Sequence, residues 1–300
     1  MQALTTLPSS QVLAMLVVNS VHSPHSRRAY SRCLCEFLEW AKGRPLSRET
    51  VKEYRTYLEE QGRGSSTVNQ TLAAIRAFAR ESAQAGLIDQ QVSDSIASVE
   101  NIPSRGIRTG NWLTLEQAKA LMALPDRTTL RGQRDVVILG LLAGAGMRRD
   151  EVARVLVSQV CLRDGHPLVV DLLRKKQRVG SIPLPQWVYD HCQEWIRRAQ
   201  RKPEDPLVCS IGWDGDRGTA LTGFGVWKIV HGYVKQIPGA EDIAPHDLRR
   251  TFARLAVKGG CKLDQLQVAL GHASLNTTSR YVGAMMDLEN SACDCIKLTP

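Results

Sequence analysis

The sequence predicts a mainly α-helical chain of two domains, with a small β-hairpin or sheet in the second domain, which makes it an α+β fold. Three observations support this prediction. Apolar residues recur at helical spacing through the first 105 residues, a polar stretch rich in Pro and Gly follows, and the remainder is helical except for two short strand-like runs. A chain of 300 residues is long enough for two ordinary domains.

Four helices are predicted in the first domain, residues 1–105. Apolar side chains follow helical spacing over 30–40, 51–58 and 68–79, and a shorter helix covers 90–97. Breaks rich in Gly, Pro and Ser separate the first three helices, at 43–45 and 62–66. Residues 106–111 form the linker between the domains.

The second domain, residues 112–300, begins with a helix whose first turn Thr114 and Gln117 would close as a capping box. Two β-rich runs, 168–173 and 181–184, flank the basic stretch 174–180 and predict a β-hairpin with a charged tip. Helices are expected again over 187–198, 224–235, 246–258, 263–270 and 277–286.

Composition indicates an intracellular protein with a polyanionic partner. Apolar residues make up 43% and charged residues 23% of the chain, and the longest apolar run, 136–145, is too short to span a bilayer. We see no secretory signal, which favours a cytoplasmic location. The eight cysteines include no CxxC pair and predict reduced thiols without a metal site. Residues 1–105 carry 12 basic and 10 acidic side chains, so most of the net charge of +9 lies in the second domain.

Five separated segments of the second domain offer groups suited to a phosphodiester, although each has an ordinary structural explanation when taken alone. Arg148 follows two glycines at a helix start, where an Arg can bind two phosphate oxygens, or is simply solvated. A lysine of the hairpin tip, Lys175 or Lys176, could protonate a departing oxygen, or only face solvent. His246 and Arg249 are three residues apart and share a helix face.

The last two segments are close to each other in sequence. His272 follows a helix end turned by Gly271, and Tyr281 lies in a segment with helical spacing. A tyrosine at such spacing is more often a core residue than a nucleophile. The order and spacing of all five segments therefore carry more weight than any one of them.

These motifs resemble those of the tyrosine recombinases, also called the phage integrase family. Residues 146–152, Gly-Met-Arg-Arg-Asp-Glu-Val, are similar to the family's first arginine box, and 246–250, His-Asp-Leu-Arg-Arg, to its H-x-L-R box. Leu-Gly-His at 270–272, with Tyr281 nine residues after His272, resembles the L-G-H…T-T-x-x-Y box. Lys175 lies eight residues before Pro183, as the family's hairpin lysine does. The resemblance covers 130–285 and, less specifically, the helices around 66–88, which look like a core-binding domain.

The resemblance implies a role for each of six residues. Arg148 and Arg249 would bind the non-bridging oxygens of the scissile phosphate, and His272 would add a hydrogen bond. His246 would help to deprotonate Tyr281, the nucleophile, and Lys175 would protonate the 5′-oxygen that leaves. The product would be a 3′-phosphotyrosyl intermediate, formed without metal, ATP or any other cofactor.

The resemblance also implies partners. Members of the family act on double-stranded DNA recombination sites as homotetramers, in a bacterial or phage cytoplasm and without a membrane. The C-terminal tail would pack on a neighbouring subunit or in cis. DNA contacts are expected from four arginines and one lysine: Arg27, Arg28, Arg76, Arg80 and Lys176.

The sequence departs from the family pattern in the hairpin. Arg174 stands where a glycine often flanks the lysine, and Gly180 stands where an arginine is common, so Lys176 remains a substitute for Lys175. Two other functions stay open at this point. A topoisomerase would use the same phosphotyrosine chemistry without a partner site, and a DNA-binding regulator would lack part of the catalytic set.

Overall fold

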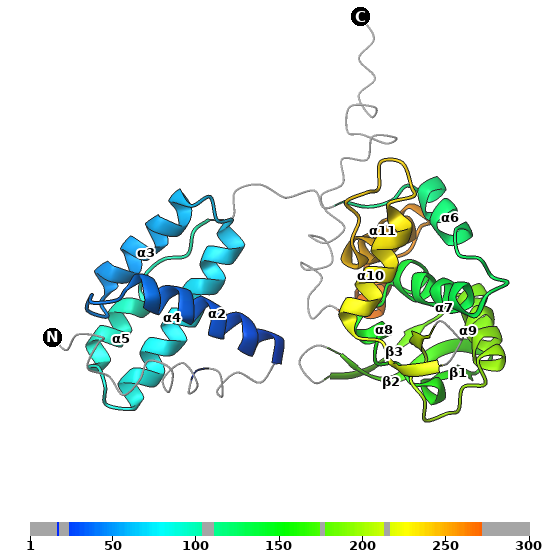
Figure 1. Cartoon of the computed structure of the whole chain (residues 1–300), viewed down its shortest axis with the longest axis horizontal. Coiled ribbons are helices and arrows are strands. Elements are labelled where there is room, and N and C mark those ends of the chain that lie inside the picture. Colours follow the sequence, from blue (N-terminus) through cyan, green and yellow to red (C-terminus); the bar gives the residue numbers. More distant parts are fainter. Residues whose placement is uncertain (1–16, 18–23, 104–110, 175–177, 213–216, 272–300) are drawn as a thin grey trace, which may run out of the picture. The chain divides into compact units, whose positions relative to one another are not determined.

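The computed structural model divides the chain into two compact units, residues 1–106 and 107–300 (Figure 1). It describes residue 17 and residues 24–103, 111–174, 178–212 and 217–271. Within these residues, no helix combines the length and apolar character needed to cross a membrane.

The first unit is a small helical domain, as predicted. Its helices are α2 (Pro24–Trp40), α3 (Arg48–Glu60), α4 (Ser65–Gln84) and α5 (Gln90–Ala97). Ser47 caps α3 by accepting a hydrogen bond from the Thr50 N–H, which explains why the helix begins there. One face of each helix contributes to a shared apolar core, which includes Phe37, Leu72 and Phe78.

The second unit is helical around two small sheets. Its helices are α6 (Leu115–Ala123), α7 (Leu130–Leu139), α8 (Arg149–Val152), α9 (Gln186–Arg198), α10 (Gly223–Val234), α11 (Pro245–Lys258) and α12 (Leu263–Leu270). The predicted capping box of Thr114 and Gln117 is present at the start of α6. The helix expected over 277–286 lies outside the described residues.

The predicted hairpin is part of a three-stranded antiparallel sheet. Its strands β1 (Val160–Arg163), β2 (His166–Arg174) and β3 (Arg178–Pro183) are hydrogen-bonded in that order. A second, two-stranded sheet joins β4 (Cys209–Ile211) to β5 (Arg217–Ala220). Strands β1, β4 and β5 were not predicted from the sequence, because they are only three or four residues long.

Strand β2 contains a bulge that changes which side chains face the core. The β2–β3 register shifts between Val169 and Leu172, and Asp171 adopts a left-handed backbone conformation with φ of 51°. Gln159 holds the bulge through a 2.8 Å hydrogen bond from its amide to the Asp171 carbonyl. Beyond the bulge, Leu172 is buried and Leu173 is exposed, so Arg174 returns to the side of the buried Leu172.

Helix α7 passes into a π-helical turn, η2 (Gly140–Gly144), before the chain reaches α8. Gly144 lies directly against the Trp187 ring of α9, with no room for a Cβ atom. The apolar core of this unit surrounds the turn and includes Leu141 and Leu142. The turn therefore fixes where the chain leaves the core and enters the segment that carries Arg148.

Candidate active site

Arg148 occupies the N-cap position of α8 and is bound to Glu151 twice. Its backbone N–H donates to Glu151 Oε2 at 2.8 Å, and its Nη1 donates to Oε1 at 2.7 Å. Neighbouring Arg149 instead pairs with Asp150 at 3.3 Å and is 40% exposed. The structure therefore distinguishes the two arginines, and Arg148 is the one that faces Glu151.

Gly146 shapes the approach to Arg148. Its φ of +64° lies in the left-handed region, and a Cβ atom there would lie 2.3 Å from the Phe252 ring of α11. Because no side chain intervenes, the Gly146 carbonyl comes close enough to accept a 2.6 Å hydrogen bond from Arg249 Nη1. The first glycine of the arginine box thus joins the two arginine segments.

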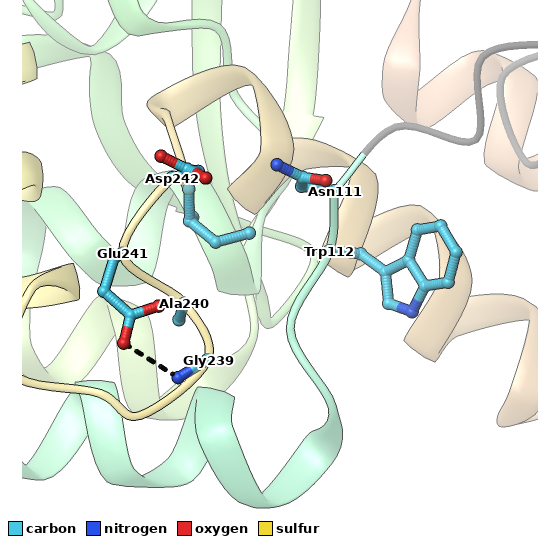
Figure 2. A pocket seen from close by; sticks show the side chains of 7 residues that line it. Asn111, Trp112, Gly239, Ala240, Glu241 and Asp242 are labelled. Atoms are coloured by element: carbon cyan, nitrogen blue, oxygen red, sulfur yellow. Dashed lines mark hydrogen bonds between the residues drawn. The ribbon is translucent and has the colours of Figure 1, made fainter.

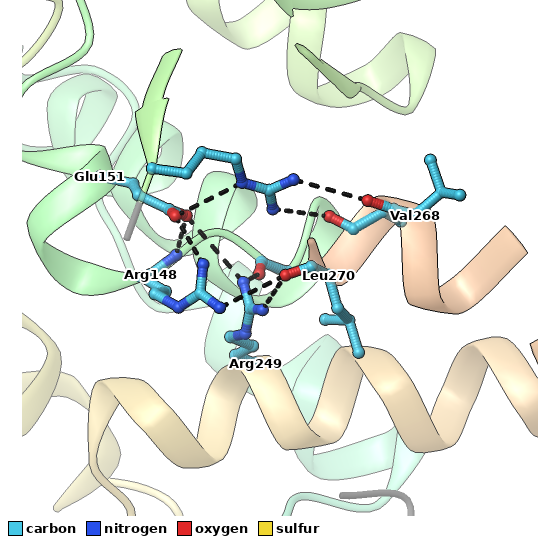
Figure 3. Close-up of polar contacts among 8 residues, drawn as sticks. Arg148, Glu151, Arg249, Val268 and Leu270 are labelled. Carbon is cyan, nitrogen blue, oxygen red and sulfur yellow. Dashed lines mark hydrogen bonds and ion pairs between the residues drawn. The ribbon is translucent and has the colours of Figure 1, made fainter. Parts of the chain in front are cut away.

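Arg249 projects from α11 into the interior and is only 1% exposed. Its Nη2 donates to the Leu270 carbonyl at the end of α12, and its Nη1 lies 3.9 Å from Glu151 Oε2. Arg148 Nη2 reaches the same Leu270 carbonyl at 3.4 Å. Two arginines separated by 101 positions in sequence therefore converge on one carboxylate and one carbonyl oxygen (Figure 3).

A third arginine, Arg174 of β2, completes this cluster. Its Nη2 donates to the Ala269 carbonyl at 2.9 Å, its Nη1 to the Val268 carbonyl at 3.5 Å, and its Nε lies 3.6 Å from Glu151 Oε1. In the sequence, Arg174 stands out only as part of the basic stretch 174–180 and as a departure from the family pattern. Strict strand alternation from Val169 would turn it away from the core, and only the bulge reverses this direction.

The cluster of Arg148, Glu151, Arg174 and Arg249 carries three positive charges and one negative charge, a formal balance of +2. Glu151 is 5% exposed, so its carboxylate is paired away from solvent. Arg148 remains 27% exposed, the most accessible of the three arginines. A partly open, positively charged site of this kind is suited to a phosphate group.

His246 lies one turn before Arg249 on α11 and keeps contact with solvent. Its pKa is lowered from the usual 6.5, first because packing removes part of its hydration and then because of the positive charges of Arg250, Arg249 and Arg148. The carboxylate of Asp247 opposes this shift. The imidazole is therefore mainly neutral near pH 7, the form that can accept a proton.

Four of the predicted residues belong to segments that follow described elements. Lys175, Lys176, His272 and Tyr281 lie outside the described residues, so their positions stay predictions. They follow described elements in the sequence, since Lys175 comes directly after Arg174 and His272 directly after Gly271.

The four arginines predicted to contact DNA belong to the first unit. Arg28 and Arg80 are exposed and Arg27 is half-buried. Arg76 donates to the Val99 carbonyl and, at 3.0 Å, to Asn101 Oδ1. Arg76 thus holds residues 99–101 against α4, and its DNA contact remains a prediction.

A cavity of about 410 Å³ lies near the start of α11 and contains none of the predicted catalytic residues (Figure 2). Asn111, Trp112 and residues 239–243 line it, including the carboxylates of Glu241 and Asp242. These charges repel a phosphate, so the arginine cluster is the better candidate. Among the described residues, no group of three or more His, Cys, Asp or Glu side chains could hold a metal ion.

Comparisons with known families identify both units. The model of the phage integrase family matches residues 111–287, and the model of the phage integrase N-terminal SAM-like domain matches residues 10–86. A tyrosine recombinase XerC from Pelobacter propionicus is 30% identical over 88% of this chain and 86% of its own length. A tyrosine recombinase XerD from Halalkalibacterium halodurans is 27% identical over 86% of this chain and 87% of its own length.

Solved structures share the fold. The XerH site-specific recombinase bound to a palindromic difH substrate has a TM-score of 0.72 at 18% identity, over 95% of this chain and 86% of that one. The Tn1549 transposon integrase in complex with circular intermediate DNA has a TM-score of 0.66 at 19% identity, over 96% of this chain and 99% of that one. At these identities the likeness concerns the fold.

Proposed function

Because the chain belongs to the phage integrase family, we propose that Arg148 and Arg249 bind the scissile phosphate of DNA and that Tyr281 is the nucleophile. The chain is a site-specific tyrosine recombinase, an enzyme that cleaves and rejoins DNA strands. The observation that carries the assignment of the site is the convergence of Arg148 and Arg249, from distant segments, on Glu151 and the Leu270 carbonyl.

The arginines address the first obstacle to cleavage, which is the negative charge of the phosphodiester. Arg148 and Arg249 neutralise the non-bridging oxygens as charge develops on them in the transition state. Glu151 holds the guanidinium of Arg148 in place through the 2.7 Å ion pair, so the donors are oriented before the substrate arrives. His272 adds a further hydrogen bond to the same oxygens.

Proton transfers address the second obstacle, which is the poor nucleophile and the poor leaving group. The Tyr281 hydroxyl gives its proton to His246 and forms a bond to phosphorus. The bond from phosphorus to the 5′-oxygen breaks, and that oxygen takes a proton from Lys175. The phosphate stays linked to the 3′-oxygen and to tyrosine, and attack by another strand's 5′-hydroxyl reverses the step without metal or ATP.

Assembly and location follow from the same family membership. We infer that the enzyme works as a homotetramer on two double-stranded recombination sites, since recombination requires four strand exchanges. Solved relatives in complex with difH substrate and circular intermediate DNA support a DNA partner. Bacterial relatives support a location in the bacterial cytoplasm, for a protein encoded by a bacterium or by a phage.

Covalent capture tests this function directly. The full chain is incubated with supercoiled plasmid that carries DNA from around its own gene, without metal or ATP, and separated on a denaturing gel. We expect a protein–DNA adduct that Tyr281→Phe abolishes, and sequencing of the adduct would map the bond that is cut. An equal adduct from both proteins would remove Tyr281 from its role, and adducts scattered over the plasmid would favour a topoisomerase.

Arginine substitutions test the phosphate site. Arg148→Ala and Arg249→Ala each remove a transition-state donor and should lower the cleavage rate by about 10²–10³-fold. Arg197→Ala is the matched control, because Arg197 lies on the surface of α9 and is 72% exposed. Cleavage at the normal rate by either site variant would contradict the assignment.

A further inference from the structure

We propose that Arg174 is a positioning residue for DNA cleavage, which holds the β2–β3 hairpin against Glu151 and the C-terminal end of α12. The inference rests on the proposed function, because Lys175, the expected donor of the leaving-group proton, is the next residue of the chain. Its consequence is that loss of Arg174 impairs the protonation of the leaving oxygen more than the binding of the phosphate.

The contacts of Arg174 connect three elements. Its Nη2 and Nη1 donate to the Ala269 and Val268 carbonyls of α12, at 2.9 and 3.5 Å, and its Nε faces Glu151 of α8 at 3.6 Å. These carbonyls belong to the last turn of a helix, the end that carries partial negative charge. The Val268 carbonyl also accepts a 2.9 Å hydrogen bond from the Gly271 N–H. A side chain that is only 9% exposed therefore fixes the end of a strand to two helices.

The backbone around Arg174 is built to admit this side chain. The bulge at Asp171, with its left-handed φ of 51°, returns Arg174 to the core side of β2. Gly271 has a φ of +59° and lies against the guanidinium, where a Cβ atom would come within 2.4 Å of Arg174 Nη1. On the neighbouring strand, a Cβ atom at Gly180 would lie 3.3 Å from Arg174 Cδ. Both glycines leave the path of the long side chain clear.

The position of the hairpin depends on Arg174 more strongly than the position of α12 does. The end of α12 is also bound by Arg148 and Arg249 through the Leu270 carbonyl, and Leu270 packs with Leu266 in a small apolar cluster. Near the tip of the hairpin, by contrast, the paired side chains Leu173 and Val179 are 47% and 66% exposed. Removal of Arg174 should therefore free the end of β2 while α12 keeps its other contacts.

The chemical step provides a readout that a general loss of structure would not reproduce. The 5′-oxygen leaves as a poor alkoxide unless a donor protonates it, whereas a sulfur atom in its place leaves as a stable thiolate and needs no proton. The two substrates are synthetic duplexes centred on the bond mapped by covalent capture. They differ only at the 5′-bridging position, which is oxygen in one and sulfur in the other. The rate of adduct formation is measured on both under single-turnover conditions.

We expect Arg174→Ala to slow cleavage of the oxygen substrate by about 10–100-fold, the scale of a misplaced catalytic group, and the sulfur substrate by less than about 3-fold. Arg174→Met keeps the packed stem without the donors and should show the same selectivity. Arg174→Lys should recover part of the rate, because an ammonium group can still bind one carbonyl. An equal loss on both substrates by the Ala and Met variants, or no loss on either, would overturn the inference.

Two controls separate this inference from the function on which it rests. Lys175→Ala should be slow on oxygen and rescued by sulfur, whereas Arg148→Ala should be slow on both because it loses phosphate stabilisation. If Lys175→Ala is not rescued, the proposed role of Lys175 is wrong. If Lys175→Ala is rescued and Arg174→Ala is not, only the inference about Arg174 is wrong.

Discussion

Substitution of Gly146 by Ala tests how tightly the two arginine segments are joined. Gly146 combines a left-handed φ of +64° with contact to the Phe252 ring, and its carbonyl holds Arg249 Nη1 at 2.6 Å. A methyl group at this position must displace the ring, the backbone or both. The substitution should therefore affect stability and catalysis together.

The expected loss of stability has two parts. A non-glycine residue in the left-handed region costs about 1–2 kcal/mol. Overpacking against Phe252, which a Cβ atom would approach to 2.3 Å, costs about 1–3 kcal/mol more. We expect a total of about 2–5 kcal/mol, accompanied by a roughly 10²-fold slower cleavage because Arg249 loses its orientation.

Gly165→Ala is the matched control. Gly165 has a similar φ of +77°, but nothing lies within 4 Å of the position of its Cβ atom. It therefore reports the backbone cost alone, and the difference between the two variants isolates the packing cost. A double variant, Gly146→Ala with Phe252→Leu, should recover part of that difference because the smaller side chain makes room.

The assay is urea unfolding followed by tryptophan fluorescence, combined with covalent capture for activity. Five of the six tryptophans lie after residue 107, so the signal comes mainly from the second unit. Equal losses of stability in Gly146→Ala and Gly165→Ala, or cleavage at the normal rate by Gly146→Ala, would refute the proposed coupling of the two arginine segments.

Three further predictions concern charge. Glu151→Gln leaves buried arginines without their carboxylate and should destabilise the second unit by about 3 kcal/mol, and an unchanged urea midpoint would contradict this. The His246 pKa should lie below 6.5 in NMR titrations of the DNA-free protein, and Arg250→Gln should raise it. Since folding lowers this pKa, the contribution of His246 to stability is complete above pH 6.5, the pKa in the unfolded chain. It is lost as the pH falls toward the pKa in the folded protein. In the first unit, Arg80→Ala should reduce the slope of log K for DNA binding against log salt concentration by about one. Arg76→Ala should mainly destabilise α4. A changed salt slope in Arg76→Ala together with a loss of stability in Arg80→Ala would refute this distinction.

Sequence patterns predicted much of this fold because helices leave strong local signals. The apolar spacing over 68–79 predicted α4, and the Thr114–Gln117 pair marked the start of α6. Short strands leave weaker signals, so β1, β4 and β5 went unpredicted, as did the π-helical turn, whose extra residue has no distinct composition.

Residues of the candidate site that belong to sequence motifs were predicted. Residues whose positions depend on tertiary structure were not. Arg148 and Arg249 were predicted, and the structure brings them together with His246. The position of Arg174 depends on a bulge at Asp171, which the alternation of apolar residues in β2 does not reveal. The burial of Arg249 depends on Gly146 and on the end of α12, which are far from it in sequence.

The π-helical turn at Gly140–Gly144 has a consequence for insertions and deletions. Such a turn contains one residue more than the α-helical turn that it replaces. Because the turn already holds its extra residue, a second inserted residue would not be absorbed and would rotate the following chain by about 100° about the helix axis. Gly146 and Arg148 would then turn away from α11, while the core packing of α7 would survive. Variation in length among natural or engineered forms of this enzyme should therefore avoid this turn and occur at exposed turns such as Asp164–Gly165.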